Sequence, residues 1–373
     1  MMDSVGDYTS QLAQALARDP TNKVAVLTSA EAGPATTRQD IDVLPYISSC
    51  KLSEAPSILR EVRRWKPDLV HLQFPSGPEC DRVLPILLLL YLRWTGTPVI
   101  QTWHFIGNTF QAFRTLPFGF LSFWSVPCAV FVVDESYLEW SKSWTRFFIR
   151  HKTLRFVPNG SAIPSVELGE AERLDYRMRY AAPQKKIIAY FGFLYPGKGV
   201  EQLFEIADAT DSHIVIVGGL FTEENLRVLR KEKRQKFLTY AQNINRLANS
   251  DKWSGKVTLT GFLPPHDVAC VLKAADAVVL PYSDGCKPYN TCLYAAQAQG
   301  TFVLTTSHDR SGYHPDENTY YARPNDIASM KAALVQYHGR QLKRELLPDG
   351  GWGVVRDLHV DLYRTQLVAR TSG

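Results

Sequence analysis

Residues 186–207 read KIIAYFGFLYPGKGVEQLFEIA, and this stretch decides how the rest of the chain is interpreted. Residues 187–191 form a continuous apolar run of the kind buried in parallel sheets, and residues 200–207 have the spacing of an amphipathic helix. The loop between them carries three glycines, Gly192, Gly197 and Gly199. Lys198 lies at the mouth of the helix, where free backbone N–H groups and the helix dipole favour an anion. The stretch predicts a phosphate-binding turn, although an ordinary strand-to-helix turn with a solvated lysine has the same pattern.

This loop also imitates a nucleoside-triphosphate motif. Residues 192–198 match G-x-x-x-x-G-K, the start of a P-loop, which continues with a Ser or Thr that holds magnesium. Gly199 occupies that position, so a P-loop NTPase is disfavoured. No G-x-G-x-x-G fingerprint follows any predicted strand, which disfavours an NAD-dependent dehydrogenase.

The composition limits the class of protein. The 373 residues are enough for two domains, and contents of 45% hydrophobic and 21% charged residues are typical of globular proteins. A formal net charge of +5 is too weak to indicate nucleic-acid binding. The six cysteines form no C-x-x-C pair, and the nine histidines show no metal-ligand spacing. We therefore expect buried thiols in a reducing cytoplasm, with no metal and no cofactor.

The longest apolar run, residues 83–92, is too short to span a bilayer, which takes about 20 residues. It predicts a core helix instead. The N-terminus lacks the pattern of a signal peptide.

The first half of the chain alternates strands with helices. A helical pattern begins almost at once, after Val5-Gly6-Asp7, a triplet typical of the end of a strand-to-helix loop. No strand precedes this loop, so either the sequence starts late or the sheet lacks its usual first strand. The predicted strands are residues 23–28, 68–73, 98–102 and 128–133, and the predicted helices are residues 54–65, 81–94 and 135–144. Continuous apolar strands alternating with helices predict a doubly wound parallel sheet.

The same pattern restarts after a polar, irregular segment at residues 161–185. The predicted strands are residues 186–191, 213–217, 256–259, 277–280 and 302–305, and a long charged helix is predicted at residues 223–249. Closing helices are predicted at residues 325–337 and 354–368. We predict an α/β protein with two Rossmann-like domains, residues 1–165 and 166–352, facing a central cleft. A C-terminal helix, residues 353–373, is expected to cross back to the first domain.

Other loops of the second half also follow predicted strands. Residues 284–291 form a shaped loop before a helix that Asn290 or Thr291 can cap, which makes a second anion site. Gly218 and Gly219 permit close backbone approach by a ligand, and Phe262 and Leu263 can offer a ring and backbone groups to a nucleobase.

His104 follows the strand at residues 98–102, at the edge where open α/β sheets bind ligands. Its plainer interpretation is a hydrogen-bonded structural histidine. Two nearby segments, residues 118–124 and 144–152, mix aromatic rings with Arg and Lys. In one interpretation the rings pack in the core while the Arg and Lys side chains reach out to water. In the other the segments form a patch that rests on an anionic membrane.

These residues carry a family resemblance. The quoted pieces are FGFLYPGKGVEQLFEIA, IVIVGG, VTLTGFLPPHDVACVLKAADAVVLPY and DGCKPYNTCLYAAQAQGTFVLTT, with looser matches VGDYTSQLAQAL, DLVHLQFP, VIQTWHFIG and FVPNG. In order and spacing they resemble nucleotide-sugar glycosyltransferases of the GT-B fold, glycosyltransferase family 4 (group 1). The resemblance implies retaining transfer of a hexose-type sugar from a nucleotide diphosphate, without an obligatory metal.

The resemblance also assigns site residues. Lys198 would grip the donor diphosphate and stabilise charge on the leaving phosphate, His104 would lie at the sugar or its acceptor, and Gly6 would pass close to both substrates. The donor would be bound by the strand-end loops, through Gly6, Gly192, Gly197, Lys198, Gly218, Gly219, Phe262, Leu263, Asp284, Lys287, Tyr289, Asn290 and Thr291. A glycan or lipid-linked acceptor of cell-envelope polysaccharide biosynthesis is expected, at a cytoplasmic or peripheral membrane location.

Two departures from the family leave alternatives open. An Arg usually stands at the position of Phe193, and two glutamates at the positions of Lys287 and Ala295. Lys287 could replace the charge lost at Phe193. Alternatively, the missing Arg and glutamates mark a catalytically silent, sugar-nucleotide-binding homologue that acts as a partner or scaffold. A sugar-nucleotide epimerase would need paired carboxylates, for which only Asp284 is an obvious candidate.

Overall fold

The structure is a computed structural model. It describes residues 4–48, 51–74, 83–104, 128–131, 153–219, 231–287, 290–347 and 349–371. The chain forms two compact units: unit 1 is Met1–Gly160 with Trp352–Gly373, and unit 2 is Ser161–Gly351. The division after Gly160 precedes the sequence-based boundary at residue 165, because Ser161 donates its N–H to Gly350 O at 2.9 Å and Ile163 lies in the core of unit 2.

Unit 2 contains one seven-stranded sheet in the order β10-β9-β8-β11-β12-β14-β13. All neighbouring pairs are parallel except β13 with β14. The strands are β8 (Ile187–Phe191), β9 (His213–Val217), β10 (Val257–Gly261), β11 (Ala277–Leu280), β12 (Val303–Thr306), β13 (Gly312–His314) and β14 (Thr319–Ala322). The expected strands are confirmed. β13 and β14 were missed because these short runs mix tyrosines with polar residues.

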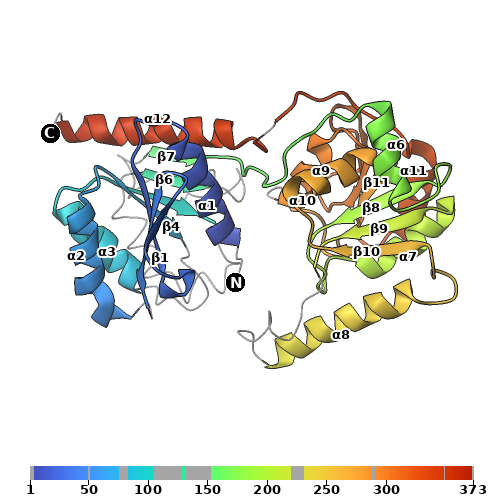
Figure 1. Cartoon of the computed structure of the whole chain (residues 1–373), viewed down its shortest axis with the longest axis horizontal. Helices are drawn as coiled ribbons and strands as arrows, with labels where there is room; N and C mark the ends of the chain where they lie inside the picture. Colours follow the sequence, from blue (N-terminus) through green and yellow to red (C-terminus); the bar gives the residue numbers. More distant parts are fainter. Residues whose placement is uncertain are drawn as a thin grey trace. The chain divides into compact units, whose positions relative to one another are not determined.

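Helices cover both faces of this sheet, as Figure 1 shows. They are α6 (Glu170–Met178), α7 (Val200–Ala207), α8 (Lys231–Ala248), α9 (Pro265–Ala274), α10 (Thr291–Ala298) and α11 (Ile327–Tyr337). Helix α9 packs against α6 and α10, and α7 packs against α8 and α11. Every residue of β9 and β11 is buried, as continuous apolar strands predict for a doubly covered parallel sheet.

Unit 1 contains two sheets in its described residues. One has the order β1-β3-β2 and the other β4-β5-β6-β7. Their strands are β1 (Val24–Ser29), β2 (Thr36–Arg38), β3 (Ile41–Ile47), β4 (Val70–Phe74), β5 (Val99–Trp103), β6 (Cys128–Phe131) and β7 (Thr153–Phe156). In a doubly wound sheet, the strand before the first helix has a neighbour on each side, and β1 and β4 correspond to those two neighbours. Both are edge strands in the described part of the chain.

The sequence missed β2, β3 and β7 in unit 1. Strand β3 includes Pro45, which cannot donate to a ladder, and its side chains are mostly half-buried. It nevertheless pairs in parallel with β1 from Val24 with Ile41 onward. Tertiary pairing therefore outweighed a weak local signal.

The described residues of unit 1 also form the helices α1 (Ser4–Ala17), α2 (Ala55–Trp65), α3 (Val83–Trp94) and α12 (Trp352–Thr371). Helix α12 returns to α1, where Tyr8 lies 5.0 Å from the Trp352 ring in a T-shaped contact. Gly6 lies within α1 and is exposed, so the expectation of a loop at residues 5–7 is wrong. The helix includes the glycine in its first turn, because the following residues bury an apolar stripe with Tyr8 and Leu12.

Several expectations fall outside the described residues, including Tyr289, Cys50, Cys80, the helix at residues 135–144 and the aromatic segments at 118–124 and 144–152. Cys128 and Cys270 are buried free thiols, and Cys286 and Cys292 are half-buried. Within the described ranges, no helix combines the length and apolarity needed to cross a bilayer.

Candidate functional site

The carboxyl ends of β10, β9, β8 and β11 bring the strand-end loops of unit 2 side by side. The Gly192 N–H donates to Val217 O at 3.0 Å, and the Gly218 N–H donates to Gly261 O at 3.0 Å. The Ser283 N–H donates to Gly197 O at 3.1 Å, which joins the β8–α7 loop to the loop after β11. Four of the predicted loops therefore form one continuous surface.

Two glycines permit this close approach. Gly218 has φ +147°, and a Cβ there would lie 2.0 Å from Gly192 O. Gly199 has φ +66°, and a Cβ there would lie 1.8 Å from Pro281 O. Any side chain at either position would displace backbone, so these loops require glycine. Gly199, the residue that disfavours a P-loop, is thus a structural requirement that the sequence did not indicate.

Lys198 lies against two aromatic rings. Its ammonium is 5.0 Å from the centroid of Tyr195 and 4.7 Å from that of Tyr282. Tyr282 is buried, and its hydroxyl donates to Asn290 Oδ1 at 3.2 Å. Burial raises the pKa of Tyr282 well above its usual value, so this ring stays neutral beneath the lysine. The rings hold the cation by cation–π attraction and leave its charge available to an anion.

The N-terminus of α7 is partly occupied by the protein itself. The Val200 N–H donates to the hydroxyl of Tyr240 at 3.0 Å, and that hydroxyl donates to Glu201 Oε2 at 2.5 Å. Tyr195 stacks on Phe237, with ring centroids 5.5 Å apart. Helix α8 therefore positions the β8–α7 loop, a role that the sequence did not reveal because α8 is distant in the chain.

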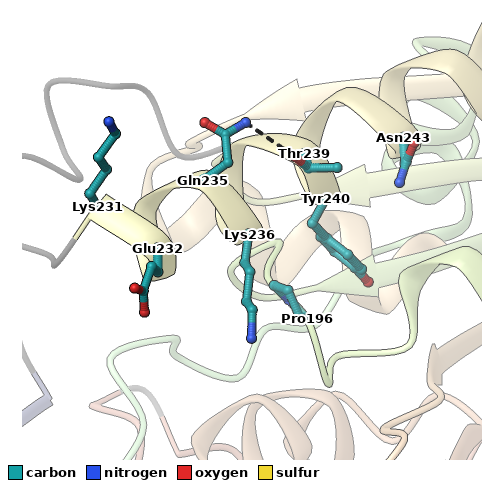
Figure 2. Close-up of a pocket in the computed structure, with 8 residues that line it drawn as sticks. All are labelled: Pro196, Lys231, Glu232, Gln235, Lys236, Thr239, Tyr240 and Asn243. Atoms are coloured by element: carbon teal, nitrogen blue, oxygen red, sulfur yellow. Dashed lines mark hydrogen bonds between the residues drawn. The ribbon is translucent and has the colours of Figure 1, made fainter.

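An open hollow of about 680 Å³ lies beside this loop, and Figure 2 shows the residues that line it. Pro196 lines one side, and Lys231, Glu232, Gln235, Lys236, Thr239, Tyr240 and Asn243 of α8 line the other. Most of these α8 side chains are exposed, which agrees with the expectation of a solvated charged face.

The second predicted anion site is also capped from within. The Asn290 side chain accepts hydrogen bonds from the N–H groups of Cys292 at 3.0 Å and Leu293 at 3.1 Å, which confirms the predicted cap. Asp284 is exposed and would lie 3.8 Å from a Cβ on Gly197. Lys287 and Thr291 are exposed on the same segment.

An aromatic pair borders the other side of the loops. Phe193 and Phe262 are 41% and 67% exposed, and their rings make a T-shaped contact at 5.9 Å. A Cβ on Gly219 would lie 2.1 Å from the Phe262 ring, so this ring covers the glycine backbone. Leu263 is half-buried against the core. The Phe262 ring is exposed, and base stacking at this ring stays a prediction.

Unit 1 places His104 in a polar network. His104 Nε2 donates to Gln73 Oε1 at 2.7 Å, and Gln73 Nε2 donates to His71 Nε2 at 3.3 Å. His71 Nδ1 in turn donates to the Tyr363 hydroxyl of α12 at 2.7 Å. Thr102 Oγ1 lies 2.7 Å from His71 Nε2. These contacts fix His104 in the tautomer whose Nδ1 is an acceptor.

A third histidine belongs to the same network. His359 Nδ1 donates to Val355 O at 2.8 Å, and its Nε2 lies 3.4 Å from the Tyr8 hydroxyl. Tyr8 also makes an edge contact with His104 at 4.7 Å. Burial lowers the pKa of His359 to about 4 and that of His104 to about 3, with a further contribution to His104 from His359. The pKa of His71 is lowered well below its usual value, first by burial.

The predicted site residues thus form two groups. All the described ones except Gly6 and His104 lie on the strand-end loops of unit 2, whereas those two lie in unit 1. The sequence missed Tyr195, Tyr282 and Tyr240 around Lys198. In unit 1 it missed Gln73, although His71 and Gln73 alternate on an otherwise apolar strand, a signal for one polar face.

Comparison with known proteins agrees with this architecture. Residues 185–339, which lie within unit 2, match the family model described as glycosyl transferases group 1. YtcC of Bacillus subtilis (strain 168), itself a proposed glycosyltransferase, is 26% identical over 149 residues. That alignment covers 39% of this chain and 33% of YtcC, so the chain aligns with about a third of that relative's length.

Solved structures resemble the whole chain. Sucrose-phosphate synthase of Thermosynechococcus elongatus superposes with a TM-score of 0.66 at 17% identity, covering 98% of this chain and 94% of that one. HepE of Anabaena, in complex with UDP-glucose, superposes with a TM-score of 0.63 at 12% identity, covering 100% and 96%. The chain therefore has the GT-B fold, with two Rossmann-like domains, and its similarity to the group 1 glycosyltransferases lies within unit 2.

Proposed function

We propose that this chain is a retaining glycosyltransferase that moves a hexose-type sugar from a nucleotide diphosphate to a glycan or lipid-linked acceptor. The observation that carries the proposal is Lys198, held over Tyr195 and Tyr282 where the loops after β8 and β11 meet. A cation there stabilises the diphosphate more strongly as it leaves than while it is bonded to the sugar.

The donor class has support from a structural neighbour. HepE was solved with UDP and with UDP-glucose. In this chain the exposed Phe262 would stack on the base, and the loops at Gly192 and Gly218 would let the donor approach the backbone. Retention follows if the leaving phosphate itself deprotonates the acceptor on the same face, so no protein nucleophile is assigned.

The acceptor is proposed to belong to cell-envelope polysaccharide biosynthesis. Another neighbour of the same fold, WaaG, is a glycosyltransferase involved in lipopolysaccharide biosynthesis, with a TM-score of 0.56 at 13% identity. A cytoplasmic enzyme at the inner face of a membrane would meet such acceptors. His104, with an unprotonated Nδ1, would accept a hydrogen bond from a sugar or acceptor hydroxyl.

A thermal-shift screen of nucleotide-diphosphate sugars tests the donor site. A true donor at 100 times its dissociation constant should stabilise the protein by roughly 2.7 kcal/mol. The Lys198→Ala variant should lose that shift, and an exposed control, Lys343→Ala, should keep it. No shift with any nucleotide-diphosphate sugar would contradict the proposal.

Turnover separates the enzyme from its alternative. A catalytically silent homologue, suggested by Phe193 and Lys287 at positions of family charges, would bind the donor without transferring or hydrolysing the sugar. Because Lys198 and backbone N–H groups are proposed to balance the diphosphate charge, hydrolysis should continue at an unchanged rate in excess EDTA. Loss of turnover in EDTA that magnesium restores would show that a metal is needed.

A further inference from the structure

Helices α2 and α3 of unit 1 carry an exposed aromatic and basic surface that includes none of the site residues described above. Trp94 is 82% exposed and Leu87 is 42% exposed. With Tyr91 they recur on α3 at helical spacing, so all three share one face of that helix. The opposite face buries Leu89 and Leu92. An exposed tryptophan of this kind is unusual on a protein that faces only water.

Helix α2 lies beside α3 and supplies positive charge. Leu59 and Val62 of α2 pack against Leu89 and Leu92 of α3, and Figure 1 shows the two helices together. The Arg63 guanidinium lies 4.9 Å from the centroid of the Tyr91 ring. The basic and aromatic residues therefore form one surface.

Three arginines share a face of α2, since Arg60, Arg63 and Arg64 are three and four residues apart. All three are exposed, as are Lys66 and Arg93 at the ends of the two helices. The acidic groups beside them are Glu61, which lies 4.0 Å from Arg64, and the exposed Asp68. The surface therefore has a net positive charge around its tryptophan.

We propose that this α2–α3 surface, defined by Arg60, Arg63, Arg64, Leu87, Tyr91 and Trp94, docks the protein on an anionic lipid bilayer. Trp94 and Leu87 would enter the headgroup region, and the arginines would pair with lipid phosphates. An acidic soluble partner would pair with the arginines but leave Leu87, Tyr91 and Trp94 exposed. The inference deepens the proposed peripheral location, and gives it a different surface from the one that the sequence indicated.

Vesicle flotation tests the surface without needing activity. The wild-type protein should float at low salt with vesicles of equal phosphatidylglycerol and phosphatidylcholine, and remain below vesicles of phosphatidylcholine alone. Binding should fall in 0.5 M salt, since surface charges are then screened. Replacing Arg60, Arg63 and Arg64 with Glu should weaken vesicle binding by about 100-fold, because each arginine contributes about fivefold or more to the affinity.

Matched variants decide whether the surface or the total charge matters. Arg246→Glu, Lys252→Glu and Lys343→Glu change three exposed cations of unit 2 and give the same net charge. That triple variant should bind as the wild type does. Trp94→Ser should lose about tenfold, while Met178→Ser, at an exposed apolar position of unit 2, should lose nothing. The double variant Arg60→Glu and Arg64→Glu keeps the Arg63–Tyr91 contact. It replaces the α2 triple variant in this test if that variant does not fold.

The outcomes are distinct. If the wild-type protein does not bind anionic vesicles, or binds only a soluble polyanion, both the α2–α3 surface and the peripheral location are wrong. Flotation that survives the α2 triple variant, or is lost equally in the unit 2 triple variant, would overturn the α2–α3 surface alone. Stabilisation by a nucleotide-diphosphate sugar should be unchanged in every one of these variants, so the donor site is judged separately.

Discussion

The two candidate sites are built in different ways. In unit 2, loops at adjacent strand ends meet through backbone contacts, and glycines at Gly199 and Gly218 make those contacts possible. In unit 1, Gln73 links His104 to His71, and the network joins side chains from three elements, β4, β5 and α12. The first site is local in sequence, strand by strand. The second depends on residues almost three hundred positions apart.

This difference has consequences for stability and for chemistry. A backbone site with one lysine should tolerate changes in pH but not changes in its glycines or its cation. A site of buried neutral histidines should be sensitive to acid, because each must remain uncharged in the folded state.

The largest expected effect is acid destabilisation of unit 1. The folded-state pKa values of His71, His104 and His359 lie below 6.5, so the unfolded chain binds more protons as the pH falls below about 6.5. The full stability is therefore present above that pH, and it declines toward pH 4, by about 1 kcal/mol per pH unit for each of His104 and His359. Between pH 6.5 and pH 4.5 these two together should cost about 4 kcal/mol, and His71 adds to the loss. Limited proteolysis with mass spectrometry should show cleavage in unit 1 first.

His359→Gln provides the control, because glutamine does not titrate and keeps a hydrogen-bonding group. The urea concentration at the midpoint of unfolding should then change with pH about a third less steeply. If unit 2 is cleaved first, or if the slope is unchanged, the histidines do not determine the acid sensitivity.

The next effect concerns the cation of unit 2. Lys198→Ala should lower the rate of donor hydrolysis or transfer by about 100- to 1,000-fold, as expected when a preorganised charge is removed from a leaving group. Thermal stability should change little, since the side chain is not in an ion pair with any described residue. Lys198→Arg should recover part of the rate. Full activity in Lys198→Ala would remove the lysine from the donor site.

A smaller effect is expected at Gln73, a positioning residue. Gln73→Leu removes the acceptor for His104 Nε2 and the donor to His71. The value of kcat/KM should fall about tenfold, because His104 is then free to change tautomer. Gln73→Glu keeps the acceptor but adds a negative charge, which raises the pKa of His104. A new ionisation should therefore enter the pH–rate profile.

Nitrogen-15 NMR of the histidine rings separates positioning from a general loss of structure. The His104 tautomer should be uniform in the wild type and mixed in Gln73→Leu. Gln14→Leu, a surface glutamine of unit 1 bonded only to Ser10 Oγ among the described side chains, should alter neither readout. An unchanged pH profile in Gln73→Glu would show that Gln73 does not control His104.

The fold was largely predictable because buried parallel strands are continuous apolar runs. Residues 277–280 are wholly apolar, and the observed strand β11 has those same ends. Strand β3 was missed because Pro45 and half-buried alternation weaken its local signal. Helix α3 was only partly right, since the run at residues 83–92 predicts a core helix but leaves Leu87 exposed.

The site of unit 2 was predictable for the same local reason. Gly192, Gly218 and Phe262 each follow a strand, and parallel strands end at one edge of a sheet. Tyr240 reaches α7 from a distant helix, and Tyr363 reaches His71 from the end of the chain. Contacts of that kind depend on tertiary packing, which no pattern within a window of sequence records.

The smallest expected effect tests whether Lys287 replaces the family's arginine. Lys287→Ala should weaken donor binding by about threefold, because an exposed charge is well screened by water. Phe193 is exposed enough to accept Phe193→Arg without burying a charge, and this change should restore the lost affinity. In a double-mutant cycle, the cost of Lys287→Ala should therefore be smaller in the Phe193→Arg background. Equal costs in both backgrounds, with Lys343→Ala as the control, would show that Lys287 does not compensate for Phe193. The positive charge of the donor site would then come from Lys198 and the loop backbone. One side chain would act there, whereas the histidine network of unit 1 depends on several.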